Sequence, residues 1–309
     1  MAERIQGLAG ILPPVPTFFD EHEELDLPTL REHITRLRHH GITRFVALGS
    51  NGEAVHLEPD ERRAVFVTIR DAAGADAQML AGAGALSTRG TIALCQLAAE
   101  CGADMALVLP PHHYRSQMTM AALRAHYLAV ADASPIPIVI YNMPGNSAGV
   151  DLDAETVLML SAHPNFAGVK DSSGNTAKLA EIVAGARTGF DVLAGSAGFL
   201  LPALVVGATG AIAALANIAP RECLELVDLY HAGRLDEARA LQARLVPVNT
   251  AVTSGYGVAG LKAALQFVAH YGGVPRRPLA PLGDDGRVRL RSLLAEADLL
   301  HGMRPVPQG

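Results

Sequence analysis

Long apolar runs and strong net charge are both missing from this sequence. No uninterrupted apolar stretch is long enough to span a bilayer, and the first seven residues contain no apolar core of a secretion signal. The formal net charge is −6 and no basic run exceeds two arginines, so a nucleic-acid surface is not indicated. We therefore expect a soluble, cytoplasmic protein with neither a membrane nor a nucleic-acid partner.

Cysteine is scarce as well, and the histidines are poorly placed to bind metal. Only Cys95, Cys101 and Cys223 are present, which is typical of a reducing compartment rather than of a disulfide framework. The twelve histidines form no His-x3-His pattern and no carboxylate triad accompanies them. The sequence therefore predicts no metal and no other cofactor.

Short apolar runs alternating with amphipathic stretches are what the chain has in abundance. Half of the 309 residues are apolar and 18% are charged, which excludes disorder and suits a large interior. The strand-like runs lie near residues 11–17, 44–49, 78–82, 105–109, 136–141, 166–170, 191–194 and 210–213. The helical stretches lie near residues 27–40, 59–73, 88–101, 120–133, 154–162, 177–184, 199–206 and 221–231. Because the short runs are apolar on both faces, they predict a parallel sheet covered by helices.

Eight such β/α units predict an α/β fold of the (β/α)8 TIM-barrel type. An open doubly wound sheet would place a glycine-rich dinucleotide turn after the first strand, and residues 13–17 (Pro-Pro-Val-Pro-Thr) are not such a turn. After residue 232 only helical patterns follow, near 235–245, 257–271 and 288–299. We expect residues 1–232 to form the barrel with the active site and residues 233–309 to form a helical extension packed on it.

Lysine is rare here, since only Lys170, Lys178 and Lys262 occur among 25 basic residues. Lys170 ends the strand-like run at 166–170, where burial disfavours the charged ammonium. A neutral amine can attack a carbonyl to form a Schiff base, whereas arginine cannot be deprotonated to do so. The alternative, a salt bridge to Asp171 or another carboxylate at the rim, is equally open from this run alone.

Polar residues follow the predicted strands, at the end of the barrel where functional residues gather. These strand-end residues are Ser50, Asn51, His113, Tyr114, Tyr141, Lys170, Ser172, Gly195 and Ser196. Each has an ordinary structural interpretation by itself, as a turn residue or a core aromatic. Together they place an amine and several hydroxyl groups around one barrel mouth.

This set of residues suits the chemistry of a 2-oxo acid. Lys170 would condense with the ketone, and the protonated imine would accept electrons when the adjacent C–C bond breaks or forms. Tyr141 and Ser50 could relay the protons needed for release of water. The Ser50-Asn51 turn could hold the substrate carboxylate, and Gly195 and Ser196 would leave room for the distal part of the substrate. No strong phosphate-binding signal is present, so an unphosphorylated substrate is favoured.

Four motifs, in order and spacing, resemble the dihydrodipicolinate synthase and N-acetylneuraminate lyase family of class I aldolases. They lie at residues 49–53 (Gly-Ser-Asn-Gly-Glu), 141–144 (Tyr-Asn-Met-Pro), 168–172 (Gly-Val-Lys-Asp-Ser) and 214–217 (Ala-Leu-Ala-Asn). The likeness extends along nearly the whole chain. Within the family, residues 134–138, 170–172 and 192–200 are most similar to the 4-hydroxy-2-oxoglutarate aldolases.

The resemblance implies a role for each matching residue. Lys170 would form the Schiff base, Tyr141 would donate and accept protons, and Ser50 would complete the relay. Ser50 and Asn51 would hold the carboxylate, and the carbonyl of Ile212 would line the pocket. The family is also expected to be homotetrameric, a dimer of dimers, with a tyrosine from the neighbouring subunit in the relay.

The position of that tyrosine and the substrate are the points at which the resemblance leaves alternatives. His113 aligns with the tyrosine and Tyr114 directly follows it, so either could serve, or the relay is altered. The first hypothesis is cleavage of 4-hydroxy-2-oxoglutarate to pyruvate and glyoxylate. The alternatives are condensation of pyruvate with aspartate semialdehyde, a sugar-acid aldolase or dehydratase, and a barrel that binds without catalysis. Dihydrodipicolinate synthases carry an arginine in the segment aligned with residues 145–149, and no basic residue occurs there.

Overall fold

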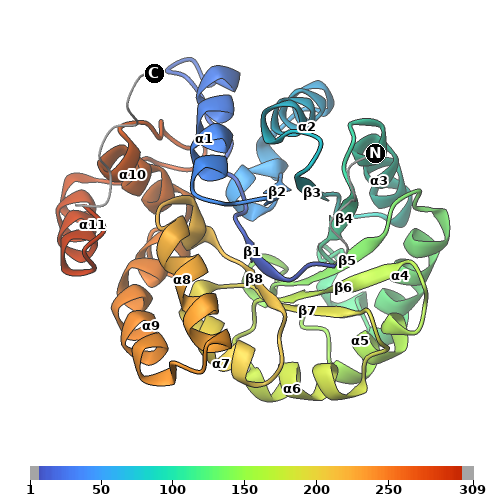
Figure 1. Ribbon diagram of the computed structural model, residues 1–309. Coiled ribbons are helices and arrows are strands. Elements are labelled where there is room, and N and C mark those ends of the chain that lie inside the picture. Colours follow the sequence, from blue (N-terminus) through green and yellow to red (C-terminus); the bar gives the residue numbers. More distant parts are fainter. Residues whose placement is uncertain (1–6, 301–309) are drawn as a thin grey trace.

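The computed structural model describes residues 7–300, in which eight parallel strands form a barrel surrounded by helices (Figure 1). The strands are β1 (Gly10–Leu12), β2 (Arg44–Ala47), β3 (Gln78–Gly82), β4 (Met105–Val108), β5 (Ile138–Asn142), β6 (Phe166–Asp171), β7 (Asp191–Ala194) and β8 (Gly210–Ile212). Neighbouring strands pair in the order β1-β8-β7-β6-β5-β4-β3-β2. The predicted TIM barrel is thus confirmed.

The barrel closes between β1 and β2 through the proline-rich segment that follows β1. Pro14 forms a parallel bridge with Val46, and the amide of Val15 donates to the carbonyl of Val46 at 2.9 Å. The sequence predicts a strand over residues 11–17, yet β1 ends at Leu12. Because a proline nitrogen cannot donate a hydrogen bond, the prolines at 13, 14 and 16 reduce the ladder to isolated contacts.

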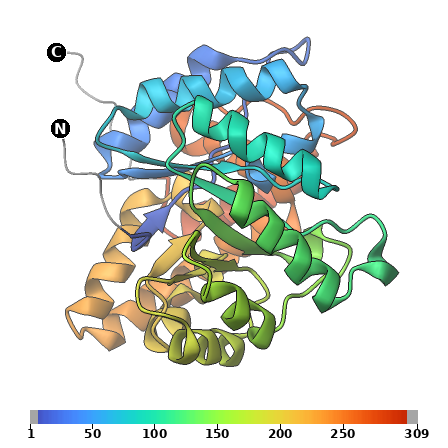
Figure 2. The same ribbon diagram turned by 90° about the vertical axis from the view of Figure 1, so that its right-hand side faces the viewer.

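A helix follows each strand and covers the outside of the barrel. These helices are α1 (Leu27–His39), α2 (Pro59–Ala73), α3 (Thr88–Glu100), α4 (Met120–Ala133), α5 (Ala154–Ser161), α6 (Thr176–Gly185), α7 (Leu200–Val205) and α8 (Pro220–His231). Figure 2 shows α2 and α3 on one side of the strands and α5 and α6 on the other. No helix within residues 7–300 is long and apolar enough to cross a membrane.

Local capping explains several helix bounds. Glu58 and Glu61 form a capping box at the start of α2, and the side chain of Ser87 accepts from the Gly90 amide at the start of α3. Gly41 and Gly102 follow α1 and α3 with φ of +85° and +81°, a left-handed conformation that glycine adopts without strain. The predicted bounds of α2 and α4 agree with the structure to the residue.

Three further helices follow the barrel: α9 (Leu235–Thr250), α10 (Gly257–Ala269) and α11 (Asp284–Glu296). A π-helical segment, Ala251–Gly255, joins α9 to α10. The sequence predicts a helix that starts at residue 288, but α11 starts at Asp284 because Asp284 and Asp285 suit a helical first turn. Residues 301–309 of the predicted extension lie outside the described residues.

The core has two layers, one inside the barrel and one between strands and helices. The inner layer consists of Leu8, Leu12, Val46, Leu80, Leu107, Val139, Tyr141, Leu193 and Ile212. The outer layer includes Ile138, Ile140, Phe166 and Val169, which face the helices. Side chains alternate along a strand, so Lys170 points to the inside of the barrel and Asp171 to the helix layer.

Candidate active site

Lys170 and Tyr141 meet on the inner face of the barrel. They are register partners on the adjacent strands β5 and β6. The Lys170 Nζ lies 3.9 Å from the centroid of the Tyr141 ring. Both residues are buried, with 4% and 5% of their surfaces exposed. The structure therefore brings together the two residues for which the sequence predicts the central chemistry.

Lys170 differs from the other two lysines in having no carboxylate partner among the described residues. All three lysines are buried. Lys178 Nζ lies 2.7 Å from Asp151 and 2.8 Å from Asp171, and Lys262 Nζ lies 2.6 Å from Glu53. The salt bridge between Lys170 and Asp171 is not formed, because the Asp171 carboxylate faces the helix layer and pairs with Lys178.

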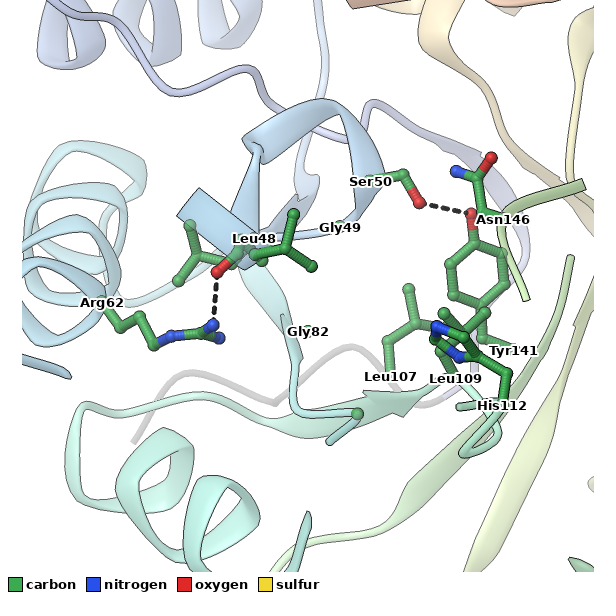
Figure 3. A pocket seen from close by; sticks show the side chains of 13 residues that line it. Leu48, Gly49, Ser50, Arg62, Gly82, Leu107, Leu109, His112, Tyr141 and Asn146 are labelled. Carbon is green, nitrogen blue, oxygen red and sulfur yellow. Dashed lines mark hydrogen bonds between the residues drawn. The ribbon is translucent and has the colours of Figure 1, made fainter. Parts of the chain in front are cut away.

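A hydroxyl pair adjoins the lysine. Ser50 Oγ, in the turn after β2, lies 3.2 Å from the phenolic oxygen of Tyr141 (Figure 3). Either oxygen can donate to the other, so a proton can pass between them. The chain separation of 91 residues shows that the barrel, not local sequence, creates this contact.

The turn that carries Ser50 and Asn51 has strained ends. Leu48 and Glu53 have φ of +53° and +51°, a left-handed backbone conformation that is unusual for residues other than glycine. Residues held this way cost about 1–3 kcal/mol each and persist where the surroundings impose them. Thr17 Oγ1 donates to the Gly52 carbonyl at 2.7 Å and so fixes the middle of the turn.

Two polar side-chain atoms that follow the carboxyl ends of strands are buried without a hydrogen-bond partner within residues 7–300. They are Asn51 Nδ2 and Ser172 Oγ. Buried polar groups in folded proteins are nearly always hydrogen-bonded, so an unpaired one calls for an explanation such as a ligand. Both residues are among the predicted substrate-binding residues.

Gly195 and Ser196 have contacts with the protein itself. A Cβ on Gly195 would lie 1.8 Å from Ser172 Oγ, so the space left by the missing side chain is filled by Ser172. Ser196 Oγ accepts from Asn249 Nδ2 of α9 at 2.9 Å and from the Gly198 amide at 3.2 Å. Only glycine fits at position 195, and the Ser196 hydroxyl ties the end of β7 to α9.

The loop after β4 turns His113 and Tyr114 outward. Both are exposed, Tyr114 at 69%, and their rings pack edge to face with centroids 5.0 Å apart. The preceding residue, His112, instead faces the cavity that Ser50 and Tyr141 line. Sequence reasoning missed His112, because nothing in a His-His pair indicates which ring the loop turns inward.

A cavity of about 310 Å³ opens beside the hydroxyl pair (Figure 3). Its lining consists of Leu48, Gly49, Ser50, Ala54, Val55, Arg62, Gly82, Gly84, Leu107, Leu109, His112, Tyr141 and Asn146. Arg62, across the cavity from Tyr141 in Figure 3, donates to the carbonyls of Ala54 and Leu57. Lys170 does not line this cavity. Tyr141 does, and its ring also contacts the Lys170 amine. Ile212 belongs to the inner core layer at the end of β8.

A buried polar network holds the ends of β5 and β6 together behind the site. Asn142 Nδ2 donates to Asp171 at 2.8 Å and to Asp151 at 2.7 Å, and Lys178 Nζ bridges the same two carboxylates. Burial raises the pKa of Asp151, but the bonds from Lys178 and Asn142 outweigh it and hold that pKa below its usual value. Asn142 and Asp171 directly follow Tyr141 and Lys170, so the network fixes the backbone of both.

Within residues 7–300 no group of three or more histidine, cysteine, aspartate or glutamate residues is arranged to hold a metal ion.

Comparisons with known proteins agree with this geometry. Residues 7–297 match the model of the Dihydrodipicolinate synthetase family. A protein of Emericella nidulans named probable 4-hydroxy-2-oxoglutarate aldolase, mitochondrial, is 44% identical over 292 residues, covering 93% of this chain and 94% of that protein. The L-threo-3-deoxy-hexylosonate aldolase of Hypocrea jecorina is 44% identical over 286 residues, covering 88% and 90%.

A solved structure shows the same fold. A member of the dihydrodipicolinic acid synthase family from E. coli K12, in complex with pyruvate, superimposes with a TM-score of 0.88 at 28% identity. The match covers 94% of this chain and 99% of that one. The resemblance identified from the motifs is therefore confirmed over almost the whole length.

Proposed function

Because the chain belongs to the dihydrodipicolinate synthetase family and is an aldolase of that family, we propose that it cleaves 4-hydroxy-2-oxoglutarate to pyruvate and glyoxylate through a lysine Schiff base. The observation that carries the mechanism is Lys170, the single buried lysine that has no ion pair within residues 7–300, in contact with Tyr141. The substrate is supported by the 44% identity to the relative named for it.

The reaction begins when the Lys170 amine attacks the C2 ketone. Protons supplied through Tyr141 and Ser50 let the ketone oxygen leave as water, which gives the iminium. Tyr141 then takes the proton from the C4 hydroxyl, the C3–C4 bond breaks, and its electron pair moves into the iminium as glyoxylate leaves. Protonation of the resulting enamine at C3 and hydrolysis release pyruvate and regenerate the amine.

The donors for the C1 carboxylate are at the ends of β2 and β6. Asn51 Nδ2 and Ser172 Oγ are buried and unpaired among the described residues, and Ser50 adjoins Tyr141. A carboxylate seated there would satisfy these groups. The carbonyl of Ile212 would line the pocket, as the family resemblance implies.

A sugar-acid substrate is the second candidate, since the relative named L-threo-3-deoxy-hexylosonate aldolase is also 44% identical. The synthase reaction with aspartate semialdehyde is less well supported. Residues 145–149 carry no basic side chain, and Arg115, which reaches this segment, is exposed and donates to the Gly149 carbonyl at 3.1 Å.

Steady-state turnover of the three substrate sets tests the proposed substrate. We expect the highest kcat/KM for 4-hydroxy-2-oxoglutarate, with loss of activity in Lys170→Arg because a guanidinium cannot condense with a ketone. A higher kcat/KM for the deoxy-hexulosonate would favour the second candidate. A preference for pyruvate with aspartate semialdehyde would refute both.

We also propose a homotetramer built as a dimer of dimers. Val55, Leu86 and Tyr114, in the loops after the neighbouring strands β2, β3 and β4, are 87%, 57% and 69% exposed. A second copy packed on these loops would bury them and bring its His113 or Tyr114 to the site. Sedimentation analysis checks the assembly, and a monomer that retains full activity would contradict it.

A cytoplasmic location is our proposal for this chain. It is supported by the three cysteines, all unpaired and buried, which suit a reducing compartment. The Emericella nidulans relative is named mitochondrial, so imaging of a tagged full-length chain in its own cell distinguishes the two locations.

A further inference from the structure

A buried ion pair connects the turn of Ser50 and Asn51 to the helices after the barrel. Lys262 Nζ, on α10, donates to Glu53 Oε1 at 2.6 Å, and both side chains are 1% exposed. The two residues are 209 positions apart in the chain. Tyr271, which follows α10, is hydrogen-bonded to His33 of α1, with 3.0 Å between Tyr271 Oη and His33 Nδ1, and Figure 1 shows α10 on the same side of the barrel as α1.

The other polar contacts of this pair are with the protein as well. Glu53 Oε2 accepts from the Arg276 amide at 2.9 Å and lies 3.3 Å from His56 Nδ1. Lys262 Nζ also donates to the Val274 carbonyl at 2.8 Å and lies 4.5 Å from the centroid of the Phe19 ring. Because these bonds occupy the charged atoms of both side chains, the pair supports the turn and does not bind substrate itself.

Burial makes each member of the pair depend on the other. Desolvation lowers the pKa of Lys262, and the carboxylate of Glu53 is the main group that opposes this change. Removing one partner would leave the other charge buried and uncompensated, which is far more disruptive than losing a surface pair.

The turn needs such support because Glu53 is held in the left-handed conformation. Its φ is +51°, and its amide donates to the Ser50 carbonyl at 3.2 Å, which closes the short helical turn Ser50–Gly52. A strained residue keeps its conformation only where the surroundings impose it. If Glu53 relaxes, the hydrogen bond that sets the position of Ser50 is lost.

We propose that Lys262 is a positioning residue, which through Glu53 holds Ser50 and Asn51 where they bind the substrate carboxylate. The helices after residue 232 would thus contribute to substrate binding. The division into a barrel, residues 1–232, and a helical extension, residues 233–309, would then not confine the functional residues to the barrel. The inference rests on the proposed function, in which this turn receives the carboxylate of a 2-oxo acid.

The test measures pyruvate trapping by borohydride as a function of pyruvate concentration, in the full-length chain. We expect Lys262→Met to raise the half-saturating pyruvate concentration about tenfold or more and to lower the limiting rate by a smaller factor. Lys262→Arg keeps the positive charge, so its half-saturating pyruvate concentration should be closer to that of the unchanged protein.

Arg70→Met is the matched control. Arg70 lies 3.2 Å from Asp104 in a mostly buried pair. Arg70 lies in the last turn of α2, and its Nη2 donates to the carbonyl of Ala77. Ala77 directly precedes β3, so this contact is at the end of the barrel opposite the site. Its removal should lower the melting temperature without changing the half-saturating concentration.

The outcomes separate the two claims. If the unchanged protein traps no pyruvate, the proposed function itself fails. If it does trap pyruvate but Lys262→Met and Arg70→Met have the same half-saturating concentration, the positioning role is refuted. If Lys262→Met does not fold, the double variant Glu53→Met, Lys262→Met takes its place, because it removes the bond and leaves neither charge buried alone. A half-saturating concentration in that variant equal to that of the unchanged protein would equally overturn the inference.

Discussion

Replacing Lys178 by methionine should destabilise the protein strongly, because this lysine neutralises a fully buried carboxylate. Lys178 bridges Asp171, whose side chain is 1% exposed, and Asp151, whose side chain is 50% exposed. Removing one partner of a buried pair costs about 3–5 kcal/mol, whereas a solvent-exposed pair contributes about 0–1 kcal/mol. Most of the stability lost in Lys178→Met should therefore come from Asp171, whose buried carboxylate would have no cationic partner.

The comparison variant keeps the lysine and removes the exposed charge. Asp151→Asn should lower the free energy of unfolding by about 1 kcal/mol or less, since Asn142 and Lys178 can still bond to the amide oxygen. Asp171→Asn combined with Lys178→Met removes both buried charges and should recover much of the loss seen in Lys178→Met alone. Urea unfolding followed by circular dichroism measures all three, and the slope of the transition reports whether the folded state stays compact.

A similar, small loss in Lys178→Met and Asp151→Asn would refute this reasoning, because it would mean that Asp171 needs no partner in the folded protein. No recovery in the double variant would do the same. A typical domain is stable by about 5–15 kcal/mol, so the expected loss is a large fraction of the total and is measurable without abolishing folding.

Three further predictions concern the site and its surroundings. Tyr141→Phe removes the hydroxyl 3.2 Å from Ser50 Oγ, and kcat should fall about 100-fold or more if the phenol transfers protons. Gly195→Ala places a Cβ 1.8 Å from Ser172 Oγ and should cost about 1–3 kcal/mol of stability, whereas Gly145→Ala, whose Cβ would meet nothing closer than Met143 Cε at 3.8 Å, should be near neutral by the same urea assay. The pKa of Asp151 is lowered in the folded state, so its ionised carboxylate stabilises the fold at pH values above its unfolded pKa. This stabilisation is lost as the pH falls through the folded pKa. Between pH 6 and pH 3, roughly the range where carboxylates titrate, the melting temperature should therefore fall less in Asp151→Asn than in the unchanged protein.

The barrel was predictable because its elements are short and locally encoded. A strand buried on both faces reads as a brief apolar run, and β3 (Gln78–Gly82) and β7 (Asp191–Ala194) have the predicted bounds. The first strand was overestimated because proline removes the amide that a ladder requires. The later helices were misplaced by a few residues, because α9 continues past Pro247 to Thr250 and α11 begins at Asp284 rather than at residue 288.

The proximity of Lys170 to Tyr141 was predictable because both lie near the carboxyl ends of their strands, and these ends meet at one mouth of a parallel barrel. The pairing of the other lysines was not, since Asp151, one of the two partners of Lys178, and Glu53, the partner of Lys262, lie 27 and 209 residues away. The local pattern likewise could not show that Ser172 fills the space beside Gly195, because that contact depends on how β6 and β7 align.

The location of the borohydride adduct shows which lysine forms the Schiff base. The protein is incubated with pyruvate and borohydride, digested, and the peptide carrying the added mass is sequenced. We expect a single adduct on Lys170, since Lys178 and Lys262 are held in buried ion pairs. An adduct on either of those lysines, or no adduct at all, would contradict it.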